Sequence, residues 1–227
     1  MSYQKVKSSH EIFDFVKSST TMMIGGFGGV GSPPTIIDTL LHSDINSLTI
    51  ISNDAGFPNI GIGKLVCSNK VKKMVTTHIG SNPVAGQMMN EKMLEIEFVP
   101  QGTFAERVRA GGVGLGGILV DSGLQSLNSS KENRMTIGGK SYFVESPLIA
   151  DVSIIYAKKA DTYGNLIYDK TARNMNPLMA MAGEVTIAEV EEIVPAGTLD
   201  PEMIVTPGVF VDIVIESKGV NWKWAWE

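Results

Sequence analysis

The chain has 227 residues, of which 43% are hydrophobic and 19% charged, and its formal net charge is −5. This acidic balance argues against nucleic-acid binding, and the apolar content is sufficient for a folded core. A single cysteine excludes an intrachain disulfide and any metal site built from several thiolates. Its apolar stretches are shorter than the roughly 20 residues that span a bilayer. We therefore expect a cytoplasmic protein without a membrane partner, folded as one domain over residues 1–227.

The first half of the chain alternates between strand-like and helical patterns. Apolar strands are predicted at Thr21–Ile24, Leu48–Ser52, Val71–Ile79 and Leu94–Val99. Helices are predicted over Ser9–Lys17, from a cap at Ser32 with Pro33 in the first turn, around Val84–Asn90, and from a capping box at Thr103 to a stop at Gly111. This alternation predicts an α/β fold with a mainly parallel sheet flanked by helices.

The second half of the chain carries hairpin signals. Strand-like segments within Arg134–Glu145 flank Gly138 and Gly139, and the segments Val152–Ala160 and Leu166–Tyr168 flank a turn around Gly164. A methionine-rich helix is predicted to follow, with Asn176 as its cap, Pro177 in its first turn and Gly183 as its end. We expect this C-terminal portion to contain β-hairpins.

Two glycine-rich runs interrupt this pattern. GGFGGVG at residues 25–31 and GGVGLGG at residues 111–117 each have glycine at five of seven positions. Such density indicates unusual backbone conformations or close approach by another molecule, although turns and helix ends are the alternative. Because ligand loops of parallel sheets lie at the carboxyl ends of the strands, both runs can lie at that edge.

The first run also matches the GxGxxG pattern of dinucleotide-binding folds, with Asp54 near the end of the next strand. Pro33 and Pro34 oppose this interpretation, because they would fall in the early turns of the helix that such a motif opens. We interpret the glycines instead as a longer open loop before a new helix. An NAD(P)-binding oxidoreductase stays as an alternative.

Other catalytic patterns are missing from the sequence. The three histidines, His10, His42 and His78, are widely separated, so no metal site is predicted. Glu97 and Glu106 flank Gln101, but nothing local singles out either carboxylate as a nucleophile. The sequence therefore predicts a site-forming glycine framework with no catalytic residue in this chain.

Six sequence blocks resemble the alpha subunits of family I coenzyme A-transferases, especially the acetate or butyrate:acetoacetate CoA-transferases. In order, they are MMIGGFGGVGSPPTIIDTLL, LTIISNDAG, THIGSNPVAG, VPQGTFAERVRAGGVGLGG, ADTYGNLIYDKTARNMNPLMAMA and LDPEMIVTPGVFVD. They span nearly the whole chain. Several blocks in the family's order are more specific than one glycine motif.

The resemblance implies the family I CoA-transferase fold and transfer of CoA between acetoacetyl-CoA or another short acyl-CoA and acetate, butyrate or acetoacetate. In this family, a glutamate of the beta subunit forms a glutamyl-CoA thioester, which agrees with the missing nucleophile. The resemblance further implies no permanently bound cofactor, coenzyme A and acyl-CoA as substrates, and a homologous beta subunit in an assembly of two alpha and two beta chains. An acyl-CoA hydrolase on the same fold is a second alternative.

Carried over by position, the resemblance assigns CoA binding to Gly25, Gly26, Phe27, Gly28, Gly29, Val30 and Gly31. It assigns substrate contacts to Asn53 and Gln101, whose amides can hydrogen-bond a carboxylate without adding charge. Arg173, Asn174 and Asn176 also match, but we interpret them as structural. The segment Val120–Ser126 departs from the family's pattern beside the glycine-rich edge, and it bears on acyl-chain preference.

Overall fold

The computed structural model describes residues 5–121 and 134–223. Within these ranges, nine strands form one sheet in the order β1, β12, β11, β9, β2, β3, β4, β5, with β10 paired to β9. All pairings are parallel except that of β10 with β9. The strands are β1 (Val6–Lys7), β2 (Thr21–Ile24), β3 (Leu48–Ile51), β4 (Val71–Thr76), β5 (Glu95–Phe98), β9 (Ala150–Asp161), β10 (Leu166–Ile167), β11 (Gly183–Val194) and β12 (Ile213–Glu216).

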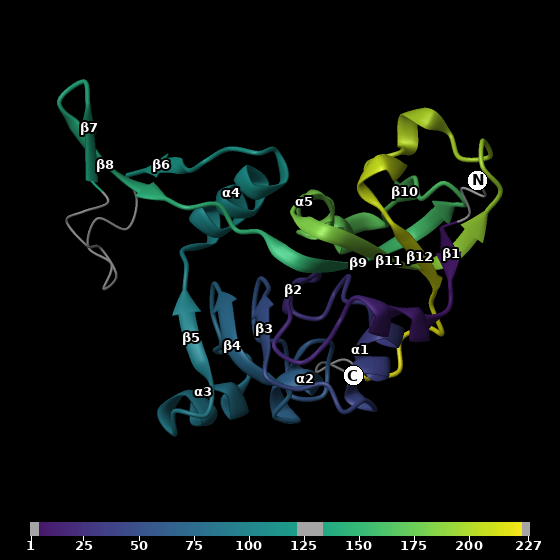
Figure 1. The fold of residues 1–227 in the computed structure, drawn as a ribbon, viewed down its shortest axis with the longest axis horizontal. Coiled ribbons are helices and arrows are strands. Elements are labelled where there is room, and N and C mark those ends of the chain that lie inside the picture. Colours follow the sequence, from purple (N-terminus) through teal and green to yellow (C-terminus); the bar gives the residue numbers. More distant parts are fainter. Residues whose placement is uncertain (1–4, 122–133, 224–227) are drawn as a thin grey trace.

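Helices cover both faces of this sheet (Figure 1). One face carries the 3-10 helix η1 (Ser9–Asp14), α1 (Pro34–Leu41), α2 (Gly63–Cys67) and α3 (Pro83–Asn90), and the other carries α4 (Gln101–Gly112) and α5 (Asn176–Met181). Alternate residues of a strand point to opposite faces of the sheet. In β2, Met22 and Ile24 pack into the core under α1 and α2, and Met23 packs into the core under α4 and α5. The predicted α/β architecture is confirmed. No helix of the described ranges is long and apolar enough to cross a membrane.

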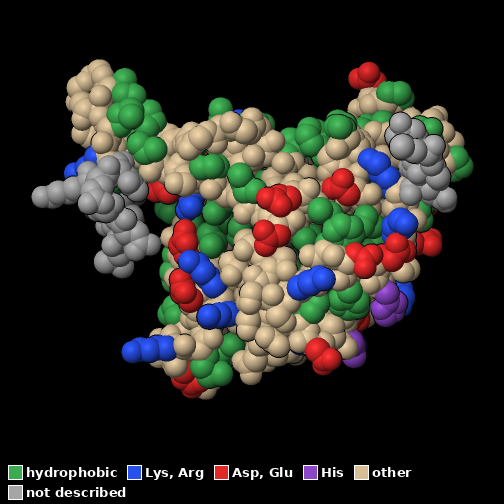
Figure 2. Space-filling view, viewed as in Figure 1, with side chains coloured by type: hydrophobic (Ala, Val, Ile, Leu, Met, Phe, Trp, Pro, Cys, Tyr) green, Lys and Arg blue, Asp and Glu red, His purple; other side chains and the backbone are tan. Residues whose placement is uncertain are grey.

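A second sheet projects from the body of the molecule (Figure 1). It is antiparallel, in the order β6 (Ile118–Val120), β8 (Lys140–Glu145), β7 (Arg134–Ile137). Gly138 and Gly139 join β7 to β8 with positive φ angles of 57° and 78°, as the hairpin prediction requires. Hydrophobic side chains gather along this hairpin in Figure 2. Met135 of β7 is 48% exposed.

Several predicted boundaries are wrong because tertiary packing decides them. Helix α1 begins at Pro34 rather than at Pro33, and Ser32 does not cap it, because the Ser32 side chain fills the space beneath Gly26. Helix α5 has Met175 at its cap position rather than Asn176. The first predicted helix is a 3-10 turn that ends at Asp14.

Helix α4 also begins earlier than predicted, at Gln101 with Pro100 as its N-cap, and it ends at Gly112. Thr103, the predicted cap, is buried, and its hydroxyl has no hydrogen-bond partner within the described part of the chain. The strand predicted to reach Ile79 ends at Thr76. Strands β11 and β12, which extend the parallel sheet, were not predicted.

Candidate functional site

The first glycine run lies at the point in the sheet where the order of the strands reverses. From the neighbouring strands β2 and β9, the strand order runs through β3, β4 and β5 on one side and through β11 and β12 on the other. Such a switch point leaves a crevice at the carboxyl ends of the strands, where α/β proteins bind ligands. Gly25 follows β2 directly, and its amide donates to the carbonyl of Ile154 on β9 at 2.9 Å. The fold therefore places this run at the edge of the expected crevice.

The run forms a closed β-turn rather than the predicted open loop. The amides and carbonyls of Phe27 and Val30 exchange hydrogen bonds of 3.0 and 3.1 Å. Gly28 and Gly29 occupy the tip with positive φ angles of 58° and 91°, a turn conformation that side-chain-bearing residues disfavour. Phe27 is 47% exposed beside this tip. The site therefore presents a defined backbone with one apolar side chain open to solvent.

A second turn closed by an antiparallel bridge follows β3. The amide of Ile60 donates to the carbonyl of Phe57 at 3.0 Å, and the two residues form an antiparallel bridge. A methyl group on Gly28 would lie 4.0 Å from the Phe57 ring, so the two turns are neighbours. This second turn was not predicted. Its signal is the recurrence of Gly-Phe-x-x-(Val/Ile)-Gly at residues 26–31 and 56–61.

Asp54 joins the two turns and connects them to the predicted substrate residues. One carboxylate oxygen of Asp54 accepts from the Gly28 amide and from Nδ2 of Asn53, each at 2.8 Å. The other oxygen accepts from the Gly56 amide at 2.8 Å. Oδ1 of Asn53 then accepts from Nε2 of Gln101 at 2.7 Å. Asn53 and Gln101, predicted separately, thus meet in one network that ends at the glycine turn.

Burial divides this network into a fixed interior and an accessible end. Asn53 is fully buried and Asp54 is 4% exposed, whereas Gln101 is exposed. The dinucleotide hypothesis needs the Asp54 carboxylate to bind a ribose hydroxyl, but Asp54 already accepts three hydrogen bonds from protein donors. Gln101 is the member of the network that can meet a ligand.

The segment before α5 holds the far end of the glycine run. Nδ2 of Asn174 donates to the Val30 carbonyl at 2.9 Å, and Nδ2 of Asn176 donates to the Gly31 carbonyl at 3.1 Å. Oδ1 of Asn176 accepts from the Tyr156 amide at 3.0 Å. The structural interpretation of these two asparagines fits these contacts, although Asn176 acts as a brace rather than as a helix cap. A surface pocket of about 440 Å³ opens here, lined by Phe27, Val30, Thr171 and Asn174.

Several backbone donors around the site have no protein acceptor. Among the described residues, the amides of Gly26, Gly29 and Gly31 make no hydrogen bond to protein. Gln101 is the first residue of α4, whose N-terminal amides and dipole favour negative charge. Backbone donors of this kind bind carbonyl, carboxylate or phosphate oxygens without a cationic side chain.

The second glycine run has a different environment. Gly111 and Gly112 are the last residues of α4. A methyl group on Gly111 would lie 2.0 Å from the Leu148 carbonyl, and one on Gly112 would lie 2.6 Å from Cβ of Met181. These glycines let α4 pack closely against the rest of the chain, and they contribute no turn like that at residues 25–31.

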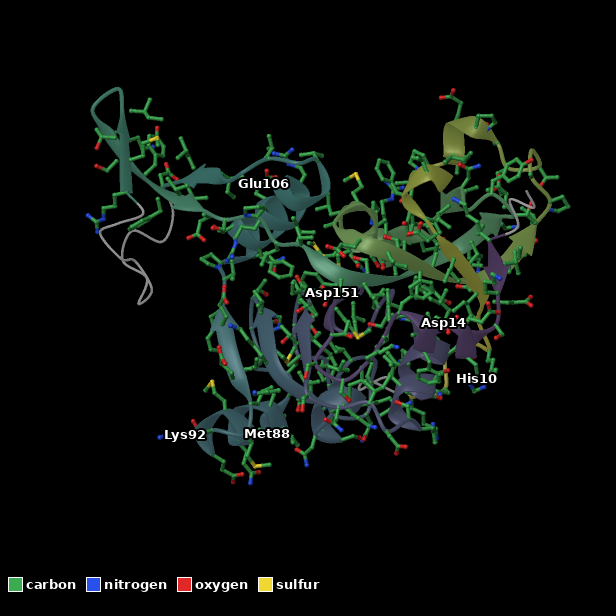
Figure 3. All side chains as sticks on the ribbon, viewed as in Figure 1. His10, Asp14, Met88, Lys92, Glu106 and Asp151 are labelled. Atoms are coloured by element: carbon green, nitrogen blue, oxygen red, sulfur yellow. The ribbon has the colours of Figure 1, made fainter. Side chains whose placement is uncertain are left out.

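The two glutamates that flank Gln101 in sequence are both ion-paired. Glu97 lies 3.3 Å from Arg107 and 3.5 Å from Lys73, and Glu106, labelled on α4 in Figure 3, lies 2.8 Å from Arg109. Neither carboxylate contacts the Asp54 network through a hydrogen bond in the described structure. The described ranges also contain no group of three His, Cys, Asp or Glu residues that could hold a metal ion.

A third glutamate, Glu189 on β11, is fully buried. Its carboxylate accepts hydrogen bonds of 2.9 Å from the amides of Thr35 and Ile36 in the first turn of α1. Burial raises the pKa of Glu189, with the hydrogen bonds opposing that shift. This carboxylate anchors α1 to the sheet and is enclosed by protein donors.

Comparison with known proteins identifies the family of this chain. A family described as "Coenzyme A transferase" matches residues 7–217. The chain is 56% identical over 226 residues to a "Probable coenzyme A transferase subunit alpha" of Bacillus subtilis, covering 99% of both chains. It therefore belongs to the coenzyme A transferase family, as the sequence blocks predicted.

Relatives with more specific names point to the same kind of subunit. The chain is 43% identical over 212 residues to the "Acetoacetyl-CoA:acetate/butyrate CoA transferase alpha subunit" of Clostridium acetobutylicum, covering 93% of this chain and 97% of that one. Both relatives are named as alpha subunits, the kind of chain that the sequence blocks predicted. A solved acyl-CoA transferase of Escherichia coli O157:H7, in a thioester complex with CoA, superposes with a TM-score of 0.83 at 22% identity. That match covers 95% of this chain but 48% of the solved chain, so this chain spans about half of that protein's length.

Proposed function

We propose that this chain is the alpha subunit of a cytoplasmic enzyme that transfers CoA between acetoacetyl-CoA or another short acyl-CoA and acetate, butyrate or acetoacetate. Residues 1–227 act as one domain and pair with a homologous beta subunit, two chains of each kind forming the enzyme. Coenzyme A and its thioesters are substrates, and no cofactor stays bound. The names of the Clostridium and Bacillus relatives support the chemistry and the subunit type.

The observation that carries this proposal is the continuous network from the glycine turn through Asp54 and Asn53 to Gln101. It joins the loop proposed to bind CoA, residues 25–31, to the two amides proposed to contact substrate. The turn offers unoccupied amides, and Gln101 offers an exposed amide at the positive end of a helix. Such groups suit a reaction in which negative charge develops on acyl oxygens.

In the proposed reaction, a glutamate of the beta subunit attacks the acyl carbon and expels CoA as a thiolate, leaving a mixed anhydride. The thiolate then attacks the glutamyl carbonyl, which releases the original acid and forms a glutamyl-CoA thioester. An incoming carboxylate reverses these steps and leaves with CoA. Unoccupied backbone amides of the glycine run stabilise the developing oxyanion, while Gln101 orients a carboxylate by hydrogen bonding.

Reconstitution with a candidate beta chain tests the proposal. The complex is supplied with acetoacetyl-CoA and acetate, and acetyl-CoA and free CoA are quantified separately. We expect acetyl-CoA only when both chains are present. Free CoA without acetyl-CoA would instead support the hydrolase alternative. Stabilisation of the chain by a nicotinamide dinucleotide at saturating concentration would support the oxidoreductase.

Two glutamine variants make this test specific to the site. Gln101→Ala removes the exposed end of the network, and we expect kcat/KM to fall by about tenfold or more, the effect of one lost hydrogen bond to a charged group. Gln87→Ala is the matched control, because the side chain of Gln87 on α3 bonds to Glu91 and to no other residue in the described part of the chain. That control should leave kcat/KM unchanged.

A further inference from the structure

The Asp54 carboxylate dictates which way two neighbouring amides face. A carboxylate only accepts hydrogen bonds, so Asn53 must turn its NH2 group toward Asp54, which it does at 2.8 Å. Oδ1 of Asn53 therefore faces Gln101. Because this oxygen only accepts, Gln101 must turn its NH2 group toward it, and Nε2 of Gln101 lies 2.7 Å from Oδ1 of Asn53. The Oε1 atom and the second NH2 hydrogen of Gln101 remain available for other partners.

Asp54 also controls the backbone on the other side of the site. Its two oxygens bind the Gly28 amide at the tip of the first turn and the Gly56 amide at the start of the second. One buried charge therefore connects three segments that are distant in sequence: the turn after β2, the turn after β3 and, through Asn53, the start of α4. The turn after β2 and the start of α4 each contribute groups to the proposed substrate site, and the turn after β3 lies against them.

We propose that Asp54 is a positioning residue for CoA transfer, which sets the amide orientation of Gln101 through Asn53 and holds the glycine turn at a fixed distance from it. The inference rests on the proposed function and goes beyond it, because Asp54 itself touches no substrate. It acts by keeping one donor and one acceptor of Gln101 aimed outward, so that no reorientation is needed when a carboxylate arrives.

Asp161 provides a matched control for a purely structural role. It is 2% exposed, and its carboxylate accepts from the amides of Tyr163 and Asn165, each at 3.0 Å, and from Nδ2 of Asn165 at 2.8 Å. Asp54 accepts from the same set of donors, two backbone amides and one asparagine amide. The donors to Asp161 all belong to one local turn between β9 and β10. Any effect that Asp54→Asn shares with Asp161→Asn therefore reflects stability.

The first test compares Asp54→Asn, Asp161→Asn, Gln101→Ala and the double variant Asp54→Asn/Gln101→Ala in the reconstituted complex. Both aspartate variants should lower the thermal midpoint, but only Asp54→Asn should lower kcat, by about tenfold or more. In the Gln101→Ala background, Asp54→Asn should lower kcat by a markedly smaller factor, because the two residues act through one network. Effects on kcat that multiply independently, or an equal loss in Asp161→Asn, would overturn the inference.

A second test needs neither activity nor a folded Asp54 variant. The variant Gln101→Glu places a carboxylate opposite Oδ1 of Asn53, and two acceptor oxygens cannot form a hydrogen bond. The Asn53 amide cannot flip to offer its NH2 group, because Asp54 holds that group. A crystal structure of the complex at pH 8 should therefore show the new carboxylate turned away from Asn53. A carboxylate retained within 3.2 Å of Asn53, about the limit for such a hydrogen bond, would show that the asparagine flips freely and would overturn the inference. If the wild-type complex transfers no CoA, the proposed function fails, and this structural result still decides whether Asp54 fixes the orientation of the Asn53 amide.

Discussion

Replacing Gly31 with alanine tests how the glycine run is held in place. Gly31 has a φ angle of +74°, and a methyl group there would lie 2.4 Å from the Ala172 carbonyl and 2.9 Å from Nδ2 of Asn174. The left-handed backbone costs an alanine about 1 kcal/mol. Moving the 172–176 segment away would also break the bonds from Asn174 and Asn176 to the carbonyls of the run, each worth about 1 kcal/mol. We expect Gly31→Ala to lower the free energy of unfolding by about 3 kcal/mol.

Gly28→Ala is the control for this prediction. Gly28 also has a positive φ angle, +58°, but the nearest atom to an added methyl group is a Phe57 ring carbon at 4.0 Å. The expected loss is therefore about 1 kcal/mol, from the backbone alone. Urea denaturation of the reconstituted complex at fixed subunit concentrations measures both variants. Equal losses for Gly31→Ala and Gly28→Ala would refute the claim that the 172–176 segment braces the run.

Three further predictions concern the scaffold. Gly86→Ala should raise the free energy of unfolding by up to about 1 kcal/mol, because Gly86 lies inside α3 with no atom within 4 Å of an added methyl group; calorimetry that finds a loss would contradict this. Asn82→Ala should lower it by about 2 kcal/mol in urea denaturation, because Asn82 caps α3 and donates to the Ala55 carbonyl at 3.0 Å; an unchanged midpoint would contradict this. Burial raises the pKa of Glu189 above 4.5, so its contribution to stability is complete below pH 4.5 and declines as pH rises through the folded-state pKa. The difference in unfolding free energy between wild type and Glu189→Gln should therefore fall with increasing pH, and a difference that grows would contradict the sign.

The sequence was informative where local pattern and tertiary structure agree. Strand β2 is a short apolar run before glycine, and the hairpin between β7 and β8 has two glycines at the positions that need positive φ angles. The cap of α4 was misassigned because Thr103 and Glu106 match a capping box, whereas the chain enters the helix directly after Pro100 and buries the Thr103 hydroxyl. Strand β11 was not predicted, because a glutamate at its centre, Glu189, is typical of an exposed segment rather than of a buried strand. Its carboxylate is buried against α1, far away in sequence.

The site shows the same division between local and distant information. Asn53 and Gln101 were assigned through family resemblance, and the structure joins them by a hydrogen bond. The sequence indicated Asp54 only as a possible ribose ligand. Its bonds to Gly28 and Gly56 could not be predicted, because they form between two turns that the parallel pairing of β2 and β3 brings together. Pairing between distant segments leaves no local signal in one sequence. The repeated Gly-Phe-x-x-(Val/Ile)-Gly pattern is the feature from which the second turn could have been found.

Covalent labelling tests the central claim most directly. This chain and a candidate beta chain are incubated with acetoacetyl-CoA, separately and together, and any thioester is trapped with borohydride before intact-mass analysis. The account predicts a CoA adduct, or its reduced product, on the beta chain only and only in the complex. An adduct on this chain would contradict the division of labour and would make one of its own carboxylates the nucleophile.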